Sequence, residues 1–510
     1  MDTQINCNSS REDWLSAKQR KWLWSLLALV CALRVVMMFF VPFTDTTEAR
    51  YAEIARKMVE TRDWITPQFE YGVPFWGKPP LHTWASALGM ELFGVNQFGA
   101  RFFIFAFGLG TLWMLYLWAR ENRGRDYALI GVVIMSTTAL IYLSLATVMT
   151  DMVMATGVCM SMAGFYSAVE RRENAQLWSY LFFVGLGIGM LAKGPVAVVL
   201  TALPIGTWGL LKNRWGDTWK RLPWIKGSLL CCLIFLPWYL AAEIKTPGFL
   251  QYFIIGEHLN RFLVPSWEGD LYGNGHAEVR GMIWVFWFAA VLPWSFFFLF
   301  PLYHSKRIIQ SIRAESNGWS LYLFCWAIAP MLFFTMASNI IATYVITGVP
   351  AISFLAIDLW RYGFKFTGVP GKRVVRFFAA TASFAAILFI IATGVSLLGV
   401  PGVFQKTQKH LVETAKSLRD GSCGDLYYWK KRYYSAEFYT DGQVEVLDSD
   451  AQLDELLTND RCDFLAIRSS HISDLPDEFL DNFKFIGKFG KEVLYYEQPC
   501  TKTYTVSVLK

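Results

Sequence analysis

Charged residues are scarce in this sequence for its length. Only 17% of its 510 residues are Asp, Glu, Lys or Arg, and 54% are apolar, whereas soluble proteins carry about 25% charged residues. The sequence also lacks a P-loop, a dinucleotide-binding fingerprint and an internal repeat. The shortage of charge argues against an ordinary soluble enzyme. The missing nucleotide motifs leave nucleotide-driven transport without a visible energy source.

Long apolar runs fill most of the chain instead. A helix needs about 20 apolar residues to cross a bilayer, and about eleven such segments are present. Their centres are Val30, Gly108, Val133, Ala155, Val184, Val199, Phe235, Phe288, Trp326, Pro350 and Ala386. The first segment is not a cleavable signal, because it is long and lacks a small-residue cleavage site. We therefore expect a polytopic α-helical membrane protein with about eleven or more transmembrane helices.

The net charge of +6 follows from topology. If the N-terminal segment is cytoplasmic, every second loop is basic, as the positive-inside rule requires. The basic residues of these loops are Arg120, Arg123, Arg125, Arg171, Arg172, Lys212, Arg214, Lys220, Arg221, Lys306, Arg307, Arg313, Arg361, Lys365, Lys372 and Arg373. We therefore expect a cytoplasmic N-terminus, an exported C-terminal tail and no nucleic-acid partner.

Two regions outside the apolar runs have their own organisation. The first outer loop, residues 43–97, contains two amphipathic helical stretches, Glu48–Val59 and Leu81–Leu92. The tail, residues 401–510, has the pattern of a small α/β domain. Its expected strands are Asp425–Trp429, Val444–Leu447, Phe464–Ile467 and Val493–Tyr496, and its expected helices are Tyr434–Tyr439, Ala451–Leu457 and Pro476–Asn482. An exported compartment permits a disulfide among Cys423, Cys462 and Cys500, but spacing does not select the pair.

Charged side chains beside apolar spans are candidates for function, because burying them in a bilayer is costly. Four clusters map to the outer face. They are Thr44–Tyr51 after the first span, Phe75–Pro80 in the same loop, Asp151 with Lys193-Gly194-Pro195, and Gly256–Phe262 in the loop that also holds His276. Carboxylates and cations that converge at one membrane face suggest acid/base chemistry next to a phosphate.

The same segments resemble a known family. From Glu48 the chain has acid-x-Arg-Tyr-Ala-Glu-Ile, followed by Asp-Trp-Ile-x-Pro from Asp63, Lys-Pro-Pro-Leu from Lys78 and Phe-Gly-x-x-x-Phe-x-x-Arg from Phe93. Glu257-His258-x-x-Arg261-Phe262, Leu292-Pro293-Trp294 and Thr343-Tyr344 continue the pattern. In their order and spacing these motifs are similar to the lipid A aminoarabinose transferases and the related protein O-mannosyltransferases, which have the GT-C fold.

The resemblance implies an inverting glycosyltransferase of a bacterial inner membrane, with residues 1–400 as its catalytic domain and 401–510 as a periplasmic domain. Its donor would be a polyprenyl (undecaprenyl) phosphate sugar and its acceptor lipid A or another envelope glycan or protein. A carboxylate deprotonates the acceptor hydroxyl, and cations stabilise the leaving phosphate. The carboxylates implied are Asp45, Glu48 and Asp151. The residues implied for donor phosphate or substrate binding are Arg50, Tyr51, Lys78, Lys193, His258 and Arg261.

The sequence departs from the family pattern in two places. Thr47 stands where the family has the first acid of an acidic pair, and Asp45 lies two residues earlier. In an extended segment residues 45 and 47 point the same way, so Asp45 is the favoured base and Glu48 the alternative. Gly77 stands where the family often has a Glu that helps a loop histidine hold a divalent metal. His258 would be that histidine, and a bound metal stays open.

Simpler roles compete with these assignments. Asp45 and Asp151 would also serve as helix N-caps, Lys78 and Lys193 would reach lipid headgroups, and His258 would pack at the interface. A lipid or solute transporter is the other functional class that such a chain suits. Transporters place charges near the bilayer midplane and show repeated halves, whereas here the charges gather at one face and no halves match.

Overall fold

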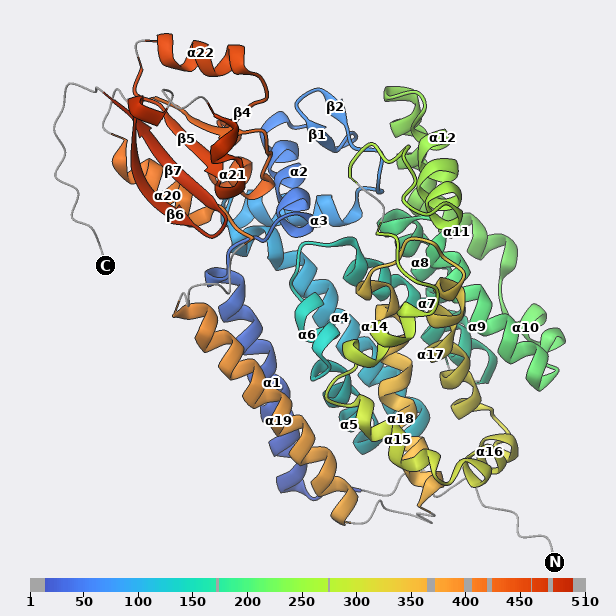
Figure 1. Cartoon of the computed structure of the whole chain (residues 1–510). Coiled ribbons are helices and arrows are strands. Elements are labelled where there is room, and N and C mark those ends of the chain that lie inside the picture. Colours follow the sequence, from blue (N-terminus) through green and yellow to red (C-terminus); the bar gives the residue numbers. More distant parts are fainter. Residues whose placement is uncertain are drawn as a thin grey trace, which may run out of the picture. The chain divides into compact units, whose positions relative to one another are not determined.

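The computed structural model describes residues 14–170, 174–273, 276–364, 372–398, 406–419, 424–459, 461–475 and 480–498 (Figure 1). The chain forms two compact units. The first consists of residues 1–39 and 57–393, and the second of residues 40–56 and 394–510. The short segment 40–56, which directly follows the first span, is therefore grouped with the C-terminal tail.

The first unit is a bundle of membrane-spanning helices. Among the described residues, seven helices are long and apolar enough to cross a membrane, or eight if one bent pair counts as a single span. The seven are α1 (Ala17–Phe40), α4 (Gln97–Arg123), α7 (Thr150–Glu170), α8 (Ala175–Lys193), α11 (Trp224–Lys245), the continuous stretch Ala342–Gly363 that includes α18 (Val349–Gly363), and α19 (Lys372–Leu397). The bent pair is α16 (Ser305–Ala314) with α17 (Trp319–Thr335), at an angle of 116°. The multi-pass helical architecture is thus confirmed.

The remaining expected spans are shorter helices. The centres expected at Val133, Val199 and Phe288 fall in elements of fewer than 18 residues, and the one at Trp326 falls in the bent pair. The apolar run around Phe288 is split because proline lacks an amide hydrogen and disrupts helix geometry, here at Pro293. These shorter elements are α5 (Arg125–Ser136), α6 (Ala139–Ser144), α9 (Val196–Lys212), α10 (Trp215–Arg221), α14 (Met282–Ala290) and α15 (Ser295–Leu302).

Helix α7 is buried along nearly its whole length and packs closely on α8. Small residues permit the approach: a Cβ atom on Gly185 would lie 2.5 Å from the carbonyl oxygen of Gly157, and one on Gly164 would lie 2.7 Å from the Trp178 carbonyl oxygen. Without a hydrophobic driving force between helices in lipid, such backbone contact is the usual source of helix association. The two helices are antiparallel neighbours, so the start of α7 and the end of α8 meet.

The two helices expected in the outer loop are present. They are α2 (Thr47–Thr61) and α3 (Leu81–Phe93), and the hairpin β1 (Gln68–Glu70) with β2 (Val73–Pro74) lies between them in sequence. The loop is tied to α11 because Lys245 pairs with Asp63 at 2.6 Å and the Trp238 indole donates a hydrogen bond to the Ile65 carbonyl oxygen at 2.8 Å. The segment after α11 contains α12 (Phe249–Gln251), the π-helix Tyr252–Asn260 and α13 (Arg261–Leu263).

The second unit contains an α/β domain with a five-stranded mixed sheet in the order β4-β3-β5-β7-β6. Its strands are β3 (Leu426–Trp429), β4 (Glu445–Leu447), β5 (Phe464–Arg468), β6 (Phe483–Phe489) and β7 (Glu492–Glu497). The pairs β3–β4 and β3–β5 are parallel, and the pairs formed by β7 are antiparallel. Its helices are α20 (Lys409–Leu418), α21 (Tyr434–Tyr439) and α22 (Asp450–Thr458), and two 3₁₀ turns span Ser469–Asp474 and Leu480–Asn482.

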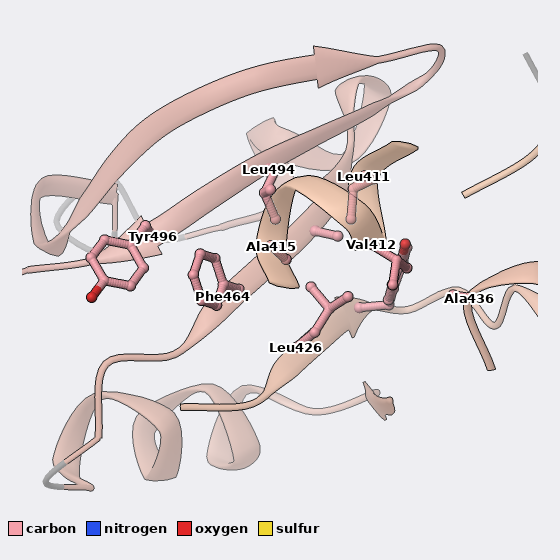
Figure 2. Packing of buried hydrophobic residues seen from close by; sticks show 10 residues of the cluster. Leu411, Val412, Ala415, Leu426, Ala436, Phe464, Leu494 and Tyr496 are labelled. Carbon is pink, nitrogen blue, oxygen red and sulfur yellow. The ribbon is translucent and has the colours of Figure 1, made fainter. Parts of the chain in front are cut away.

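Side-chain alternation along β5 gives the sheet two apolar faces. Phe464 and Ala466 belong to the cluster that includes α20 and α21, whereas Leu465 and Ile467 face the cluster that includes α22. Figure 2 shows the first cluster, in which Leu411 and Val412 of α20 pack with strand residues. The sheet is therefore covered by helices on both faces.

The four strands expected in the tail are confirmed, as are the helices at 434–439 and 451–457, while β6 and α20 were not anticipated. The expected helix Pro476–Asn482 lies partly outside the described residues, and its last three residues form a 3₁₀ turn. Cys462 is disulfide-bonded, which agrees with the expected possibility of a disulfide. Cys423 and Cys500 lie outside the described residues.

Candidate active site

The close packing of α7 on α8 creates the first charged pair of the candidate site. Asp151 lies in the first turn of α7 and Lys193 is the last residue of α8. The Lys193 ammonium group lies 2.6 Å from the Asp151 carboxylate, and both side chains are largely buried. The two candidates that the sequence placed at separate span ends are therefore direct partners.

A second charged cluster joins the segment between α2 and α3 to the π-helix that follows α12. The Lys78 ammonium group lies 2.6 Å from the Glu257 carboxylate, which also accepts hydrogen bonds from Arg261 at 3.1 and 3.2 Å. Arg261 has a second acidic neighbour, Asp270, at 3.4 Å. Burial alone would raise the pKa of Glu257, but Lys78 and Arg261 bring it below its ordinary value. Glu257 is therefore ionised and balances part of the positive charge of the two cations.

His258 connects these two clusters. Its Nδ1 lies 2.8 Å from the Phe253 carbonyl oxygen, and its Nε2 lies 3.2 Å from the carbonyl oxygen of Lys193. Burial lowers the pKa of His258, so the ring is neutral near pH 7. Gly194 follows Lys193 with φ +90°, and a Cβ atom there would lie 2.6 Å from the Phe253 ring. Glycine is therefore required for the α8–α9 turn to approach the π-helix.

The residues around His258 do not fit a metal. Both ring nitrogens already face carbonyl oxygens, and no group of three or more His, Cys, Asp or Glu within the described ranges is arranged to hold a metal ion. A Cβ atom on Gly77 would lie 2.9 Å from the Phe75 ring, so a glutamate at this position would require the ring to move. We assign no catalytic step to a metal.

The charged clusters line one cavity of about 410 Å³. Its polar wall is formed by Lys78, Lys193, Glu257, His258, Arg261, Asn339 and Tyr344. Its apolar wall is formed by Met154, Pro195, Val196, Val199, Leu259, Phe262, Leu263, Phe333 and Phe334. A cavity with cations on one wall and apolar side chains on the other suits an amphiphile with an anionic head. Asp151 is not among the lining residues and bears on the cavity through Lys193.

Three polar lining residues, Glu257, Asn339 and Tyr344, were missed as site residues. Tyr344 places its ring 4.6 Å from the Lys193 ammonium group, which is a cation–π distance. Asn339 donates hydrogen bonds to the carbonyl oxygens of Arg261 and Val264 at 2.6 and 2.8 Å and so fixes the loop that carries Arg261. Tyr344 and Glu257 both stand within motifs of the family resemblance, and that signal would have found them. Nothing in the local sequence marks Asn339.

The other four candidates lie in the second unit, on segment 40–56. Asp45 is engaged by Ser435 of the tail, which donates from its backbone nitrogen at 3.1 Å and from its hydroxyl group. Arg50 lies over the ring of Tyr51 at 5.5 Å and donates a hydrogen bond to the Tyr434 hydroxyl. Glu48 lies in the first turn of α2, and both Glu48 and Tyr51 are buried.

The structure changes two expectations about Asp45. Its carboxylate accepts the amide hydrogen near the start of α21, so the helix that it caps is α21 and not α2. Helix α2 begins at Thr47, so the side-chain alternation of an extended segment does not relate Asp45 to Thr47. Burial raises the pKa of Asp45 to about 6, although the Ser435 hydrogen bonds oppose the shift. A carboxyl with this pKa is partly protonated at mildly acidic pH.

Known proteins share both the sequence pattern and the architecture. Residues 34–253 match the family model of dolichyl-phosphate-mannose-protein mannosyltransferases. A protein of Erwinia tasmaniensis, named undecaprenyl phosphate-alpha-4-amino-4-deoxy-L-arabinose arabinosyl transferase, is 28% identical over 68% of this chain and 61% of its own length. The protein of that name from Enterobacter sp. is 29% identical over 67% of this chain and 60% of its own length. This chain thus spans about 60% of the length of these relatives.

The solved structure of ArnT from Cupriavidus metallidurans bound to undecaprenyl phosphate matches 94% of this chain and 98% of its own, with a TM-score of 0.74 and 18% identity. The chain has the GT-C fold and resembles the aminoarabinose transferases. The family resemblance and the multi-pass membrane architecture expected from the sequence are therefore confirmed. At 18% identity the likeness to the solved structure establishes the fold alone.

Proposed function

We propose that this protein transfers a sugar from a polyprenyl (undecaprenyl) phosphate donor to an envelope acceptor such as lipid A, at the periplasmic face of the inner membrane. The observation that carries the proposal is the cavity, because it combines an apolar wall with Lys78, Lys193 and Arg261. The apolar wall suits the isoprenoid chain, and the cations suit the phosphate. The relatives named for undecaprenyl phosphate aminoarabinose support the same donor class.

The proposed reaction is a single displacement with inversion. A carboxylate removes the proton of the acceptor hydroxyl, the oxygen attacks the anomeric carbon, and the bond to the lipid phosphate breaks. Negative charge then grows on the phosphate, where fixed cations lower the barrier. Lys78 and Arg261 pair with Glu257, and Arg261 also lies 3.4 Å from Asp270, so two carboxylates balance these two cations. The ammonium and guanidinium groups line the cavity, and they stabilise the departing phosphate by donating hydrogen bonds to it.

Asp45 is the proposed base, with Glu48 and Asp151 as alternatives. A general base works best when its pKa lies near the operating pH, and burial raises the pKa of Asp45 to about 6. The two donors on Ser435 also fix the orientation of the Asp45 carboxylate. Asp151, by contrast, lies 2.6 Å from the Lys193 ammonium group, so its more direct role is to position that lysine. Arg50 and Tyr51 are proposed to contact substrate.

The proposal includes an orientation in the membrane, with a cytoplasmic N-terminus and a periplasmic C-terminal domain. Its support is the set of basic loops that alternate along the sequence. Reporter fusions at Lys372 and Lys409 are expected to report opposite sides of the membrane. Two reports from the cytoplasm would exclude this topology, and the periplasmic site with it.

Other acceptors belong to the same reaction class. A protein hydroxyl or another envelope glycan would use the same donor, and the match to protein mannosyltransferases over residues 34–253 favours keeping a protein acceptor in the test. Purified protein is to be incubated with defined polyprenyl-phosphate sugars and with each acceptor separately. We expect transfer from the lipid-linked sugar. Transfer from a soluble nucleotide sugar without polyprenyl phosphate would overturn the proposal.

A further inference from the structure

Two adjacent residues at the start of α21 hold two of the candidate residues on segment 40–56. Ser435 donates hydrogen bonds from its backbone nitrogen and its hydroxyl group to the Asp45 carboxylate. Tyr434 accepts a hydrogen bond from Arg50. Helix α21, which lies about 390 residues away in sequence, thus holds both Asp45, the proposed base, and Arg50, which is proposed to bind substrate.

Ser435 is itself fixed by the core of the tail. Its side chain is fully buried, and its Oγ accepts a hydrogen bond from the Gln408 backbone nitrogen at 3.0 Å. The Gln408 side chain in turn accepts a hydrogen bond from the Tyr428 hydroxyl at 2.9 Å. Tyr428 lies on β3 and belongs to the apolar core of the sheet. The Ser435 hydroxyl therefore has one orientation, and it points its hydrogen at Asp45.

The segment is also held at Phe43 and at the backbone of Asp45. Phe43 is fully buried, packs edge-on against Phe438 with ring centroids 4.8 Å apart, and donates its backbone amide to the Tyr439 hydroxyl at 2.9 Å. The Asp45 amide donates to the Lys406 carbonyl oxygen at 2.7 Å. Backbone, ring and carboxylate contacts together leave the segment little freedom to shift.

We propose that Tyr434 and Ser435 are positioning residues for the transfer reaction, and that the C-terminal domain is therefore part of the catalytic apparatus. They act by fixing Arg50 and Asp45, and they do not touch the reacting atoms. This inference rests on the proposed function, since it assigns a role within that reaction. The domain then contributes to the rate for every acceptor, in addition to any role in choosing one.

Two variants test the positioning role in the full-length protein. Ser435→Ala removes the hydroxyl donor to Asp45, and Tyr434→Phe removes the acceptor for Arg50 while keeping the ring. Because small displacements of reacting groups cost up to about 100-fold in rate, we expect kcat to fall about 10- to 100-fold, with the KM for the lipid-linked donor unchanged. Ser449→Ala is the matched control, because Ser449 lies in the same domain and its side chain forms the capping box of α22 with Gln452.

The pH profile supplies a readout that general weakening of the domain would not move. The Ser435 hydrogen bonds favour the ionised form of Asp45, so Ser435→Ala is expected to move the acidic limb of kcat to higher pH. Four nearby groups also influence Asp45 through their charge or titration, and they stay in place in this variant. They are Glu437, Lys431, Tyr433 and Tyr428.

Hydrogen exchange gives an independent check on the same variants. Amides of residues 43–51 are expected to exchange faster in Ser435→Ala than in Ser449→Ala, at equal thermal stability. The inference is overturned if wild-type protein transfers sugar and both Ser435→Ala and Tyr434→Phe keep its kcat and pH profile. It is also overturned if Ser449→Ala lowers kcat as much as they do. Inactive wild-type protein would instead count against the proposed function.

Discussion

Lys78→Met is the sharpest test of how the cavity binds its donor. Methionine keeps most of the apolar stem and removes the ammonium group that lies 2.6 Å from Glu257. Arg261 remains at 3.1 Å from that carboxylate, so Glu257 keeps a partner and the fold is expected to survive. A hydrogen bond to a charged group contributes about 1.5–3 kcal/mol. Its loss should weaken binding of undecaprenyl phosphate by about 10- to 150-fold.

Binding is to be measured by titrating undecaprenyl phosphate into purified protein in nanodiscs, with a thermal melt recorded for each variant. Lys245→Met is the matched control, because Lys245 pairs with Asp63 and does not line the cavity. We expect the control to bind as the wild type does. A folded Lys78→Met protein with wild-type affinity would refute the assignment of Lys78 to the donor phosphate.

Three further results are expected. The first compares Asp45→Asn, Glu48→Gln and Asp151→Asn in single-turnover transfer, with thermal stability recorded for each. Loss of the base should lower the transfer rate about 100-fold or more, so Asp45→Asn should be the slowest of the three at unchanged stability. A near-normal rate for Asp45→Asn would assign the role of base to another carboxylate. Gly185→Val should separate α7 from α8, because its Cβ would lie 2.5 Å from a backbone oxygen. The variant should therefore have a lower melting temperature and a lower transfer rate. Gly110→Ala is the control: its Cβ would meet no atom within 4 Å, so neither quantity should change. Burial raises the pKa of Glu497 to about 7, so the native state binds this proton more tightly than the unfolded state does. The stability of the tail should therefore fall as the pH rises from about 4.5 through 7. Glu497→Gln should flatten this pH dependence in a series of thermal melts, and an unchanged slope would contradict the raised pKa of Glu497.

Local sequence patterns predicted the elements of this fold well where one residue type repeats at a fixed spacing. The apolar runs around Val30 and Ala386 are long helices, and the apolar run at Phe464–Ile467 became β5, which is buried on both faces. β6 was missed because lysines at 484 and 488 and a glycine at 487 interrupt its apolar character at the edge of the sheet. The break near Phe288 was missed because a window average does not register one proline.

The sequence identified charged residues of the candidate site, but it did not predict which residues they pair with. Sequence position alone marked Asp151 and Lys193 as charges at span ends, whereas their pairing depends on how closely glycine lets α7 approach α8. Ser435 carries no local signal at all, because its importance arises from folding the tail against segment 40–56. Asp45 was identified from a motif, but the helix that it caps lies far away in sequence.

The proposed donor of the sugar is a polyprenyl phosphate. The most direct measurement is transfer by the purified full-length protein in nanodiscs, with undecaprenyl-phosphate-linked 4-amino-4-deoxy-L-arabinose as the first donor, related lipid-linked sugars as a panel, and lipid A as acceptor. Mass spectrometry of the acceptor is expected to show one added sugar, and the Asp45→Asn protein is expected to show almost none. Modification of the acceptor by a soluble nucleotide sugar in the absence of polyprenyl phosphate, or no transfer from any lipid-linked donor in the panel, would contradict a polyprenyl-phosphate donor for this protein.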